Sequence, residues 1–377
     1  MNSTIAPPQI IAPPVKAGKS RHPAHTLAET LLLIAAATLL LEGAFAAFGV
    51  GMEEILEPDP VFGTRHIANK QIVWRMEGYS NESLNSVGLR DSERQISKPA
   101  GTLRIALLGD SATEGLQVPL SDTYGKVMER RLTELLHRPV EVINFGCSGY
   151  STGQEVLQFE QQVAQYKPDV TILLYNRGDN VENIRKPGDL KAEPRPYFYL
   201  DQGHLRQDDE ILTVNKKALT PNAVLDFLRR NSNIYGVLSH ANLNLSINEP
   251  LYRKVRSLVL KPFKTKNRKT VPLYAPQDGW AVTRELIKRL DADCKKADSK
   301  LLVVAFPNVV QDKEFGLQIE SMQTLSKEGS FAFYDLTKTF RWHPEPMKLF
   351  LKFHFSTKGH ALVADEIAKT LSEGKLI

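Results

Sequence analysis

A long apolar run near the N-terminus limits what this chain can fold into. Residues 31–52 read LLLIAAATLLLEGAFAAFGVGM, and Glu42 is the one charged residue among these 22. A helix of about 20 apolar residues spans the hydrocarbon core of a bilayer. The run is apolar on every helical face, which disfavours an amphipathic helix packed on a soluble core. No second run of this length follows, so the sequence predicts a single membrane span, bounded at 29–52.

The residues before the run predict its orientation. Residues 1–28 are rich in Pro and Ala, contain no acid and read as a disordered tail. Cytoplasmic flanks are enriched in Lys and Arg, and this tail carries Lys16, Lys19 and Arg21. We therefore expect an inner-membrane protein with a cytoplasmic tail and a periplasmic or exterior soluble part. A cleaved signal peptide is the main alternative, and a buried soluble helix is the other.

Composition excludes several classes of protein. The chain has 48 Lys and Arg against 43 Asp and Glu, with 42% hydrophobic residues, which is ordinary for a globular protein. Residues 53–377 hold 45 basic and 41 acidic residues, so a nucleic-acid partner is not indicated. The two cysteines, Cys147 and Cys294, cannot form a disulfide framework, and whether they pair with each other stays open.

Beyond residue 100 the hydrophobic pattern alternates between two periods. Short apolar runs predict buried strands, and stretches with apolar residues at helical spacing predict helices between them. The sequence therefore predicts an α/β domain whose mainly parallel, doubly wound sheet has about five strands. The predicted strands are Leu103–Leu108, Val140–Ile143, Val170–Leu174, Leu301–Ala305 and Phe331–Tyr334, and the predicted helices are Thr123–Leu136, Glu155–Tyr166, Ala281–Ala297, Gln311–Leu325 and Lys358–Leu371.

Two segments depart from that alternation. Residues 53–100 have no strong period and read as an irregular lead-in that packs on the main domain, residues 101–377. Residues 185–275 interrupt the main domain as an insertion, in which we expect a hairpin at 197–205 and a helix at Val224–Leu238.

The insertion also contains a strongly basic stretch. Residues 251–271 carry eight basic residues and no acid, with spaced apolar residues among them. One interpretation is a short amphipathic helix whose cationic face binds an acidic glycan or the membrane surface. The alternative is a solvated surface arm.

A serine follows the first predicted strand. Gly109, Asp110 and Ser111 stand at its carboxyl end, the edge at which open α/β sheets bind ligands. Backbone N–H groups at the start of a following helix can stabilise an oxyanion, so Ser111 is a candidate nucleophile. The alternative is a plain helix N-cap. A phosphate-binding loop is disfavoured, because no Gly-Lys-Ser/Thr follows and Asp110 and Glu114 would repel phosphate.

A serine nucleophile needs a general base. Among the nine histidines, His354 lies just before the last predicted helix, in a loop at the same sheet edge as Ser111. We expect His360 to lie within that helix with a structural role, and His343 is a weaker candidate base.

These residues together resemble the SGNH, or GDSL-type, hydrolase superfamily of serine esterases and acyltransferases. Residues 109–111 are similar to its first block, residues 144–151 to its second and residues 354–360 to its last. The blocks keep their order from about residue 84 to 373, and residues 85–91 resemble the approach in membrane-anchored bacterial members. The resemblance implies a flavodoxin-like three-layer sandwich.

The resemblance also implies roles for individual residues. Ser111 would be the nucleophile and His354 the base, while the backbone N–H groups of Ser111 and Gly149 would hold the oxyanion. The third block departs from the family's Gly-Asn-Asp, because Asp179 stands where the family has its oxyanion-binding Asn. An ionised carboxylate cannot donate a hydrogen bond, so Asn180 or Asn176 is the candidate replacement.

The last block departs as well. The family usually has an Asp two or three residues before the histidine, whereas Leu351 and Lys352 stand there. That carboxylate orients the histidine and stabilises its charged form. A dyad of Ser111 and His354 remains possible, since some members dispense with the acid.

Two functional hypotheses follow. The first is a membrane-anchored ester hydrolase or O-acyltransferase, supported at its site by Asp110 and Asp179, with acylated envelope polysaccharide as the substrate class that the resemblance implies. The second is a catalytically impaired SGNH-like module, tethered for interaction or assembly. No Cys/His cluster has metal-ligand spacing and no glycine pattern suits a dinucleotide, so neither metal nor cofactor is expected. The sequence leaves the oligomeric state open.

Overall fold

The structure is a computed structural model that describes residues 23–186, 189, 192–220, 222–239, 279–307 and 313–377. The chain divides into two compact units, Met1–Phe48 and Gly49–Ile377. The first 22 residues of the predicted tail and the basic stretch at 251–271 lie outside the described residues.

The first unit contains one long apolar helix. α1 spans Pro23–Phe48, and a window within His25–Phe48 reaches a mean hydropathy of 2.2. The helix begins earlier than the predicted span. It also ends earlier, because Gly49, at φ +62°, takes the left-handed conformation that ends helices. Its length and composition suit a membrane anchor, and a signal sequence near the N-terminus meets the same test.

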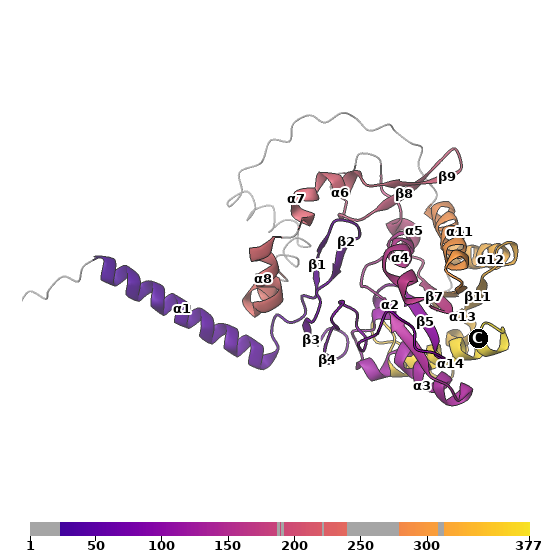
Figure 1. Ribbon diagram of the computed structural model, residues 1–377, viewed down its shortest axis with the longest axis horizontal. Coiled ribbons are helices and arrows are strands. Elements are labelled where there is room, and N and C mark those ends of the chain that lie inside the picture. The colour runs from indigo at the N-terminus through magenta and orange to yellow at the C-terminus, as the bar shows by residue number, and fades with distance from the viewer. Residues whose placement is uncertain (1–22, 187–188, 190–191, 221, 240–278, 308–312) are drawn as a thin grey trace, which may run out of the picture. The chain divides into compact units, whose positions relative to one another are not determined.

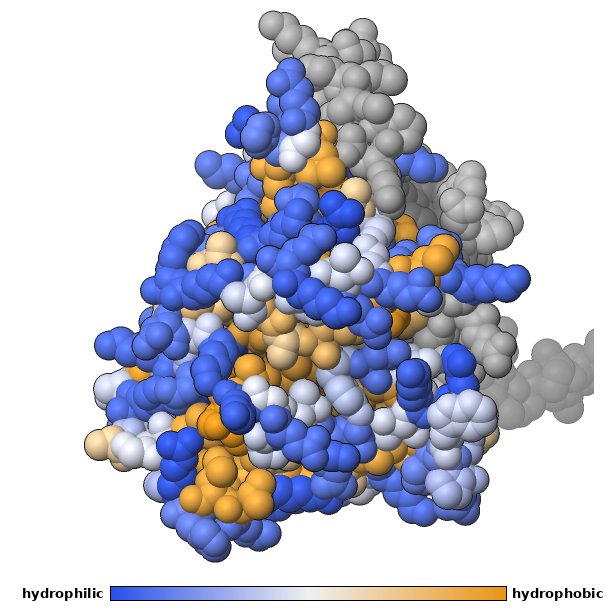
Figure 2. Space-filling model, turned by 90° about the vertical axis from the view of Figure 1, so that its right-hand side faces the viewer, coloured by the Kyte–Doolittle hydropathy of each residue, from blue (hydrophilic) through white to orange (hydrophobic). Residues whose placement is uncertain are grey.

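The surfaces of the two units differ in kind. α1 exposes Leu32, Leu39 and Leu40 by 72–76%, which is unfavourable in water for large apolar side chains. The face of the second unit shown in Figure 2 is mainly hydrophilic, with apolar side chains in smaller patches. The second unit is therefore the part of the chain built as a water-exposed domain.

Five strands form the central sheet, in the order β11-β10-β7-β5-β6 (Figure 1). All neighbours pair in parallel. β5 and β7 are buried along their whole length, as expected for strands covered on both faces. This confirms the predicted doubly wound α/β sheet. The strands are β5 Leu103–Leu108, β6 Val140–Asn144, β7 Val170–Tyr175, β10 Lys300–Ala305 and β11 Ala332–Asp335.

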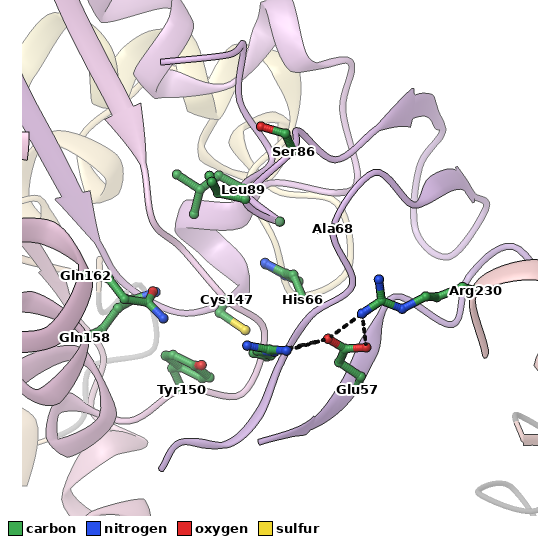
Figure 3. Close-up of a pocket in the computed structure, with 13 residues that line it drawn as sticks. Glu57, His66, Ala68, Ser86, Leu89, Cys147, Tyr150, Gln158, Gln162 and Arg230 are labelled. Carbon is green, nitrogen blue, oxygen red and sulfur yellow. Dashed lines mark hydrogen bonds and ion pairs between the residues drawn. The ribbon is translucent and has the colours of Figure 1, made fainter. Parts of the chain in front are cut away.

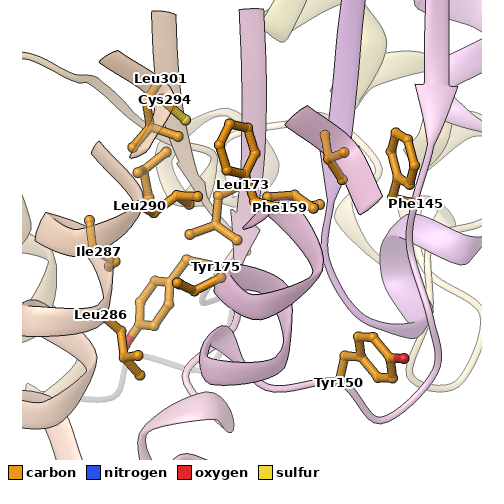
Figure 4. Close-up of a cluster of buried hydrophobic side chains, with 14 of the residues drawn as sticks. Phe145, Tyr150, Phe159, Leu173, Tyr175, Leu286, Ile287, Leu290, Cys294 and Leu301 are labelled. Carbon is orange, nitrogen blue, oxygen red and sulfur yellow. The ribbon is translucent and has the colours of Figure 1, made fainter. Parts of the chain in front are cut away.

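Helices cover both faces of the sheet. Side chains alternate along β5, so that Ala106 and Leu108 enter one apolar core while Ile105 and Leu107 enter the other. The first core, shown in Figure 4, includes residues of α4, α11 and α12, and the second includes residues of α3, α13 and α14. These helices are α3 Tyr124–Leu136, α4 Thr152–Gln158, α11 Gly279–Lys296, α12 Lys313–Glu328, α13 Thr337–Arg341 and α14 Thr357–Glu373.

The second predicted helix differs most from its prediction. α4 begins at Thr152, because Ser151 and Gln154 form a capping box ahead of it. After Gln158 the chain continues through a π-helical turn, Phe159–Val163, and a 3₁₀ turn, Ala164–Tyr166. The polar capping box therefore determines where this helix begins, and the spacing of hydrophobic residues could not predict that position.

The lead-in is more regular than predicted. Residues 53–100 contain two small antiparallel pairs, β1 with β2 and β3 with β4. Each strand has only four residues, so a hydrophobic period of two was too short to detect. The strands are β1 Leu56–Asp59, β2 Gly63–His66, β3 Gln71–Trp74 and β4 Ser80–Ser83.

The described part of the insertion holds the predicted hairpin and several short helices. β8 and β9 pair antiparallel. The helix predicted at Val224–Leu238 is interrupted, since α8 ends at Asn231 and Ser232 separates it from helical residues 233–239. The elements are β8 Tyr197–Asp201, β9 His204–Asp208, α6 Glu210–Val214, α7 Lys216–Leu219 and α8 Ala223–Asn231. The remaining short helices are α2 Ser111–Glu114, α5 Asp179–Glu182, and the 3₁₀ turns Leu120–Asp122 and Pro346–Leu349.

Arg90 attaches the lead-in to the main domain. Its guanidinium is 1% exposed and donates to the backbone carbonyls of Glu114, Gly115 and Val118. It also pairs with the Glu82 carboxylate at 2.8 Å. One buried cation thus satisfies the end of α2 and the segment after it, and makes the lead-in part of the fold.

We predict that Arg90→Ala destabilises the second unit by about 3–5 kcal/mol, because it removes the Arg90 donor from buried carbonyls and the cation from Glu82. Urea unfolding of the full chain in detergent micelles measures this. Arg130→Ala is the matched control, since exposed Arg130 has one bond, to the Ser121 carbonyl, and a change within about 0.5 kcal/mol is expected. Equal losses in the two variants would contradict the role of Arg90.

Candidate active site

The strand order places a crevice at the end of β5. The chain runs outward to β6 on one side of β5 and to β7 on the other, and such a reversal is where open α/β sheets bind ligands. Gly109 makes the turn from β5, and a Cβ there would lie 2.0 Å from the Thr113 hydroxyl. Ser111 then begins α2, whose N-cap is Asp110, accepting from the Ala112 N–H at 2.9 Å.

His354 meets Ser111 at this crevice. Its Nε2 lies 2.9 Å from the Ser111 Oγ. The histidine sits in a tight hairpin before α14, closed by the bridge between Phe350 and Phe355 and by the Leu351 N–H donating to the His354 carbonyl at 2.8 Å. The structure therefore brings together the nucleophile and base that the sequence suggested, 243 residues apart in the chain.

Glu77 completes this arrangement from the lead-in. Its Oε2 lies 3.0 Å from Nδ1 of His354 and accepts the Phe353 N–H at 3.2 Å. Burial raises the pKa of Glu77, but the hydrogen bonds from His354 and Phe353 outweigh it, so the pKa lies below its ordinary value. An ionised carboxylate thus faces the histidine on the side opposite the serine, which is the geometry of a Ser-His-acid triad.

Sequence reasoning missed Glu77 because no motif marks it. It lies 277 residues before His354, in a turn between β3 and β4 with φ +64°. At the two positions where the acid was expected, the side chain of Lys352 lies over the Phe353 ring at 5.0 Å and Leu351 is partly exposed. The hairpin contributes only the base, and the lead-in contributes the acid.

Two backbone N–H groups are available for an oxyanion. Within the described residues, the N–H groups of Ser111 and Gly149 donate to no protein atom. Gly149 is exposed and has φ +77°, a conformation that favours glycine. The loop before it is fixed to the nucleophile turn, because the Cys147 N–H donates to the Gly109 carbonyl at 3.1 Å.

Glu114 holds that loop and α2 together. Its fully buried carboxylate accepts from the Ser148 N–H at 2.9 Å, from the Ser148 hydroxyl and from His66 Nε2 at 2.7 Å. Burial raises the pKa of Glu114, but His66 and Ser148 outweigh it and lower the pKa. Burial lowers the pKa of His66, but Cys147 and Glu114 raise it well above its ordinary value. The pair is therefore a buried ion pair at neutral pH.

The side chain of Asn180, which the sequence suggested as an oxyanion donor, makes other contacts in the structure. The Asn180 amide donates to Gln318 at 3.0 Å and accepts from the Tyr175 hydroxyl at 3.1 Å. These contacts use Asn180 between α5 and α12, and they give no support to an oxyanion role. The side-chain amide of Asn176 donates to Asp110 at 3.0 Å.

A family model matches the part of the chain that contains Ser111. Residues 107–190 match the model of the GDSL-like Lipase/Acylhydrolase family. Residues 107–190, which contain Ser111, are thus similar to a GDSL-like lipase/acylhydrolase domain. None of the curated proteins matches the chain in sequence.

Several solved structures are similar to this chain in fold. TesA has 9% identity and a TM-score of 0.42, over 73% of this chain and 99% of that one. An esterase, EstA, from Pseudoalteromonas sp. has 11% identity and a TM-score of 0.39, over 72% and 98%. A lipase/acylhydrolase from Enterococcus faecalis has 13% identity and a TM-score of 0.40, over 72% and 96%. Similarity at this level identifies no substrate.

Two other histidines, His360 with its expected structural role and the weaker candidate base His343, make contacts away from Ser111. His360 lies within α14, fully buried, and its Nδ1 accepts the Tyr124 N–H at 3.2 Å. Burial, followed by the charge of Arg90, lowers the pKa of His360 to about 3. His343 accepts the Glu345 N–H at 3.1 Å in the turn after α13.

A separate cavity lies on the far side of the Glu114–His66 pair. Its volume is about 230 Å³, and His66, Cys147 and Tyr150 are among its walls (Figure 3). Neither Ser111 nor His354 lines it. Cys147 and Cys294 are both buried free thiols, and no cluster of three metal-ligating side chains occurs among the residues that the structure describes.

We predict opposite charge states for two buried histidines. At pH 7 His66 carries protons on both nitrogens, whereas His360 is neutral with its proton on Nε2, because Nδ1 accepts from Tyr124. Since the pKa of His66 is raised, its stabilising charge is complete at low pH and is lost as pH rises through that value. Histidine nitrogen NMR of the full chain from pH 5 to 9 checks this. Titration of His66 near its ordinary pKa of about 6.5 would refute the ion pair.

Proposed function

We propose that this protein is a serine ester hydrolase in which Ser111, His354 and Glu77 form the catalytic triad. Ser111 Oγ attacks the ester carbonyl carbon while His354 Nε2 takes its proton. The carbon–oxygen bond to the alcohol then breaks, and the imidazolium gives that proton to the departing oxygen. Water adds to the acyl-enzyme by the same sequence and releases the acid.

The continuous Glu77–His354–Ser111 hydrogen-bond chain carries this proposal. The alternative of an impaired SGNH-like module rested partly on the missing acid in the last block. Glu77 supplies an ionised carboxylate at the nitrogen that needs it, so that objection no longer applies. The unpartnered N–H groups of Ser111 and Gly149 fit the oxyanion role that we propose for them.

The exposure of the site favours hydrolysis over acyl transfer. Ser111 and His354 are both partly exposed, so water reaches an acyl-enzyme without a second substrate. An open groove of about 650 Å³ also borders the His354 hairpin, with Tyr79, Phe350 and Leu351 among its walls.

We also propose that α1 anchors the hydrolase in a membrane with the second unit outside the cytoplasm. The basic residues before α1 and the exposed apolar surface of α1 support this placement. The envelope polysaccharide esters implied by the family resemblance are then on the same side as the site.

We predict that Ser111→Ala abolishes ester turnover. The full chain in detergent micelles, given p-nitrophenyl acetate, should lose activity by a factor of about 10³ or more, because no nucleophile remains. A fluorophosphonate probe should label the wild type stoichiometrically and leave Ser111→Ala unlabelled. Ser372→Ala is the serine control for labelling, because Ser372 is exposed near the end of α14. Equal acetate release by the wild type and Ser111→Ala would rule out Ser111 as the nucleophile.

We predict that Glu77→Gln lowers kcat by about 10³–10⁴-fold with KM little changed, because a neutral amide cannot stabilise the imidazolium. Since the pKa of Glu77 is lowered, its contribution is present at neutral pH and is lost as pH falls through that value. Glu345→Gln is the control, an exposed carboxylate near the same hairpin that pairs with Lys348. A kcat for Glu77→Gln within threefold of that of the control would contradict the triad.

A further inference from the structure

Three carboxyl groups converge behind the nucleophile. Asp110 belongs to the turn after β5, Glu155 to α4 and Asp179 to the start of α5. Asp179 and Glu155 are 2% and 0% exposed. Within the described residues, no lysine, arginine or histidine forms an ion pair with any of the three. Several buried carboxylates without a cation cannot all stay ionised, so protons must be retained among them.

The contacts of Glu155 and Asp110 show how this cluster divides its charge. Both carboxyl oxygens of Glu155 are buried without a hydrogen-bond partner, which is tolerable only for an uncharged acid. Asp110 accepts from the Ala112 N–H and the Asn176 side-chain amide, at 2.9 and 3.0 Å, and such donors favour the ionised form. Burial raises the pKa of Asp110, but its two donors oppose that rise, whereas the pKa values of Asp179 and Glu155 are raised well above their ordinary values by burial. Asp110 is therefore the carboxyl group of the three that ionises most readily.

Asp179 has one oxygen satisfied and one free. Its Oδ2 accepts from the Thr152 hydroxyl at 2.8 Å and more weakly from the Asn176 N–H at 3.4 Å. Its Oδ1 has no hydrogen-bond partner in the part of the chain that the structure describes. Asn176 links the two acids, since its backbone N–H donates to Asp179 and its side-chain amide donates to Asp110. Through Asn176, Asp179 is therefore connected by hydrogen bonds to Asp110, the residue that precedes Ser111.

The surroundings favour the neutral form of Asp179. Burial and then the charge of Asp110 raise its pKa well above the ordinary value, with Glu182 adding to this, and the bonds from Thr152 and Asn176 only partly oppose it. Burial likewise raises the pKa of Glu155 well above its ordinary value, and the neighbouring acidic groups add to this rise. Two arginines of neighbouring segments are engaged by other carboxylates: Arg177 pairs with Glu314, and Arg195 pairs with Glu182 and Glu193.

We propose that Asp179 acts as a neutral carboxylic acid whose Oδ1–H donates a hydrogen bond to the oxyanion formed at Ser111. This inference rests on the proposed function. It explains how an Asp stands at the family's amide position, because a carboxylic acid kept neutral by its site is a hydrogen-bond donor. The proton stays on Asp179 throughout the reaction, and Asp110 keeps it there by repelling a second negative charge.

Three variants test the donor role through the pH dependence of kcat. Asp179→Leu should lower kcat by about 10²–10³-fold, the cost of one lost oxyanion donor. Asp179→Asn should recover most of that loss, because an amide also donates. The wild-type rate should fall at alkaline pH, where Asp179 ionises, and this alkaline limb should be absent in Asp179→Asn. Glu182→Gln should keep the neutral-pH rate and move the limb to lower pH, because it removes one repelling charge.

Infrared spectroscopy tests the protonation state without relying on activity. The full chain at pH 7 should show the carbonyl stretch of buried protonated carboxylic acids, and Glu155→Gln should retain the part that belongs to Asp179. Absence of that band from the wild type would overturn the proposal even if every variant failed to fold. A loss of kcat in Asp179→Asn as large as in Asp179→Leu would also overturn it.

The two proposals fail in different ways. If the wild type neither turns over esters nor reacts with the fluorophosphonate probe, the proposed function fails. If Ser111 is labelled and esters are cleaved but Asp179→Asn keeps the alkaline limb, only the donor role of Asp179 fails.

Discussion

The buried carboxylate of Glu114 joins the segments from which the site is built. It accepts from His66 of the lead-in and from Ser148 of the loop that ends at Gly149, while it belongs to the same short helix as Ser111. A buried charge of this kind is stable only with its partners in place. The positions of Ser111, of the loop that ends at Gly149 and of the lead-in therefore depend on the same buried carboxylate.

The lead-in is consequently part of the catalytic domain. Arg90 holds the end of α2 through three backbone carbonyls, and Asp91 accepts the Asn144 N–H at 2.9 Å where β6 ends. The same segment carries Glu77 to the histidine hairpin. The segment before the main domain thus places a carboxylate beside His354, where the last block itself has none.

The carboxyl groups around Ser111 differ in pKa because their environments differ. Glu77 is partly exposed and hydrogen-bonded, which keeps it ionised, whereas Asp179 and Glu155 lie without cations in a buried cluster, which keeps protons on them. The same functional group therefore serves as a charge stabiliser on one side of Ser111 and, in our proposal, as a neutral donor on the other.

The sequence by itself determined the α/β fold and the buried strands of its sheet, because short apolar runs and helical spacing are local patterns. Short motifs also suggested the roles of Ser111 and His354. It did not reveal the small strand pairs of the lead-in, the contacts that occupy Asn180, or Glu77. Only the tertiary structure decided those, since a hydrogen bond between residues 277 positions apart depends on how the chain returns to the sheet edge. The charge state proposed for Asp179 depends likewise on burial beside Asp110 and Glu155, which no linear pattern records.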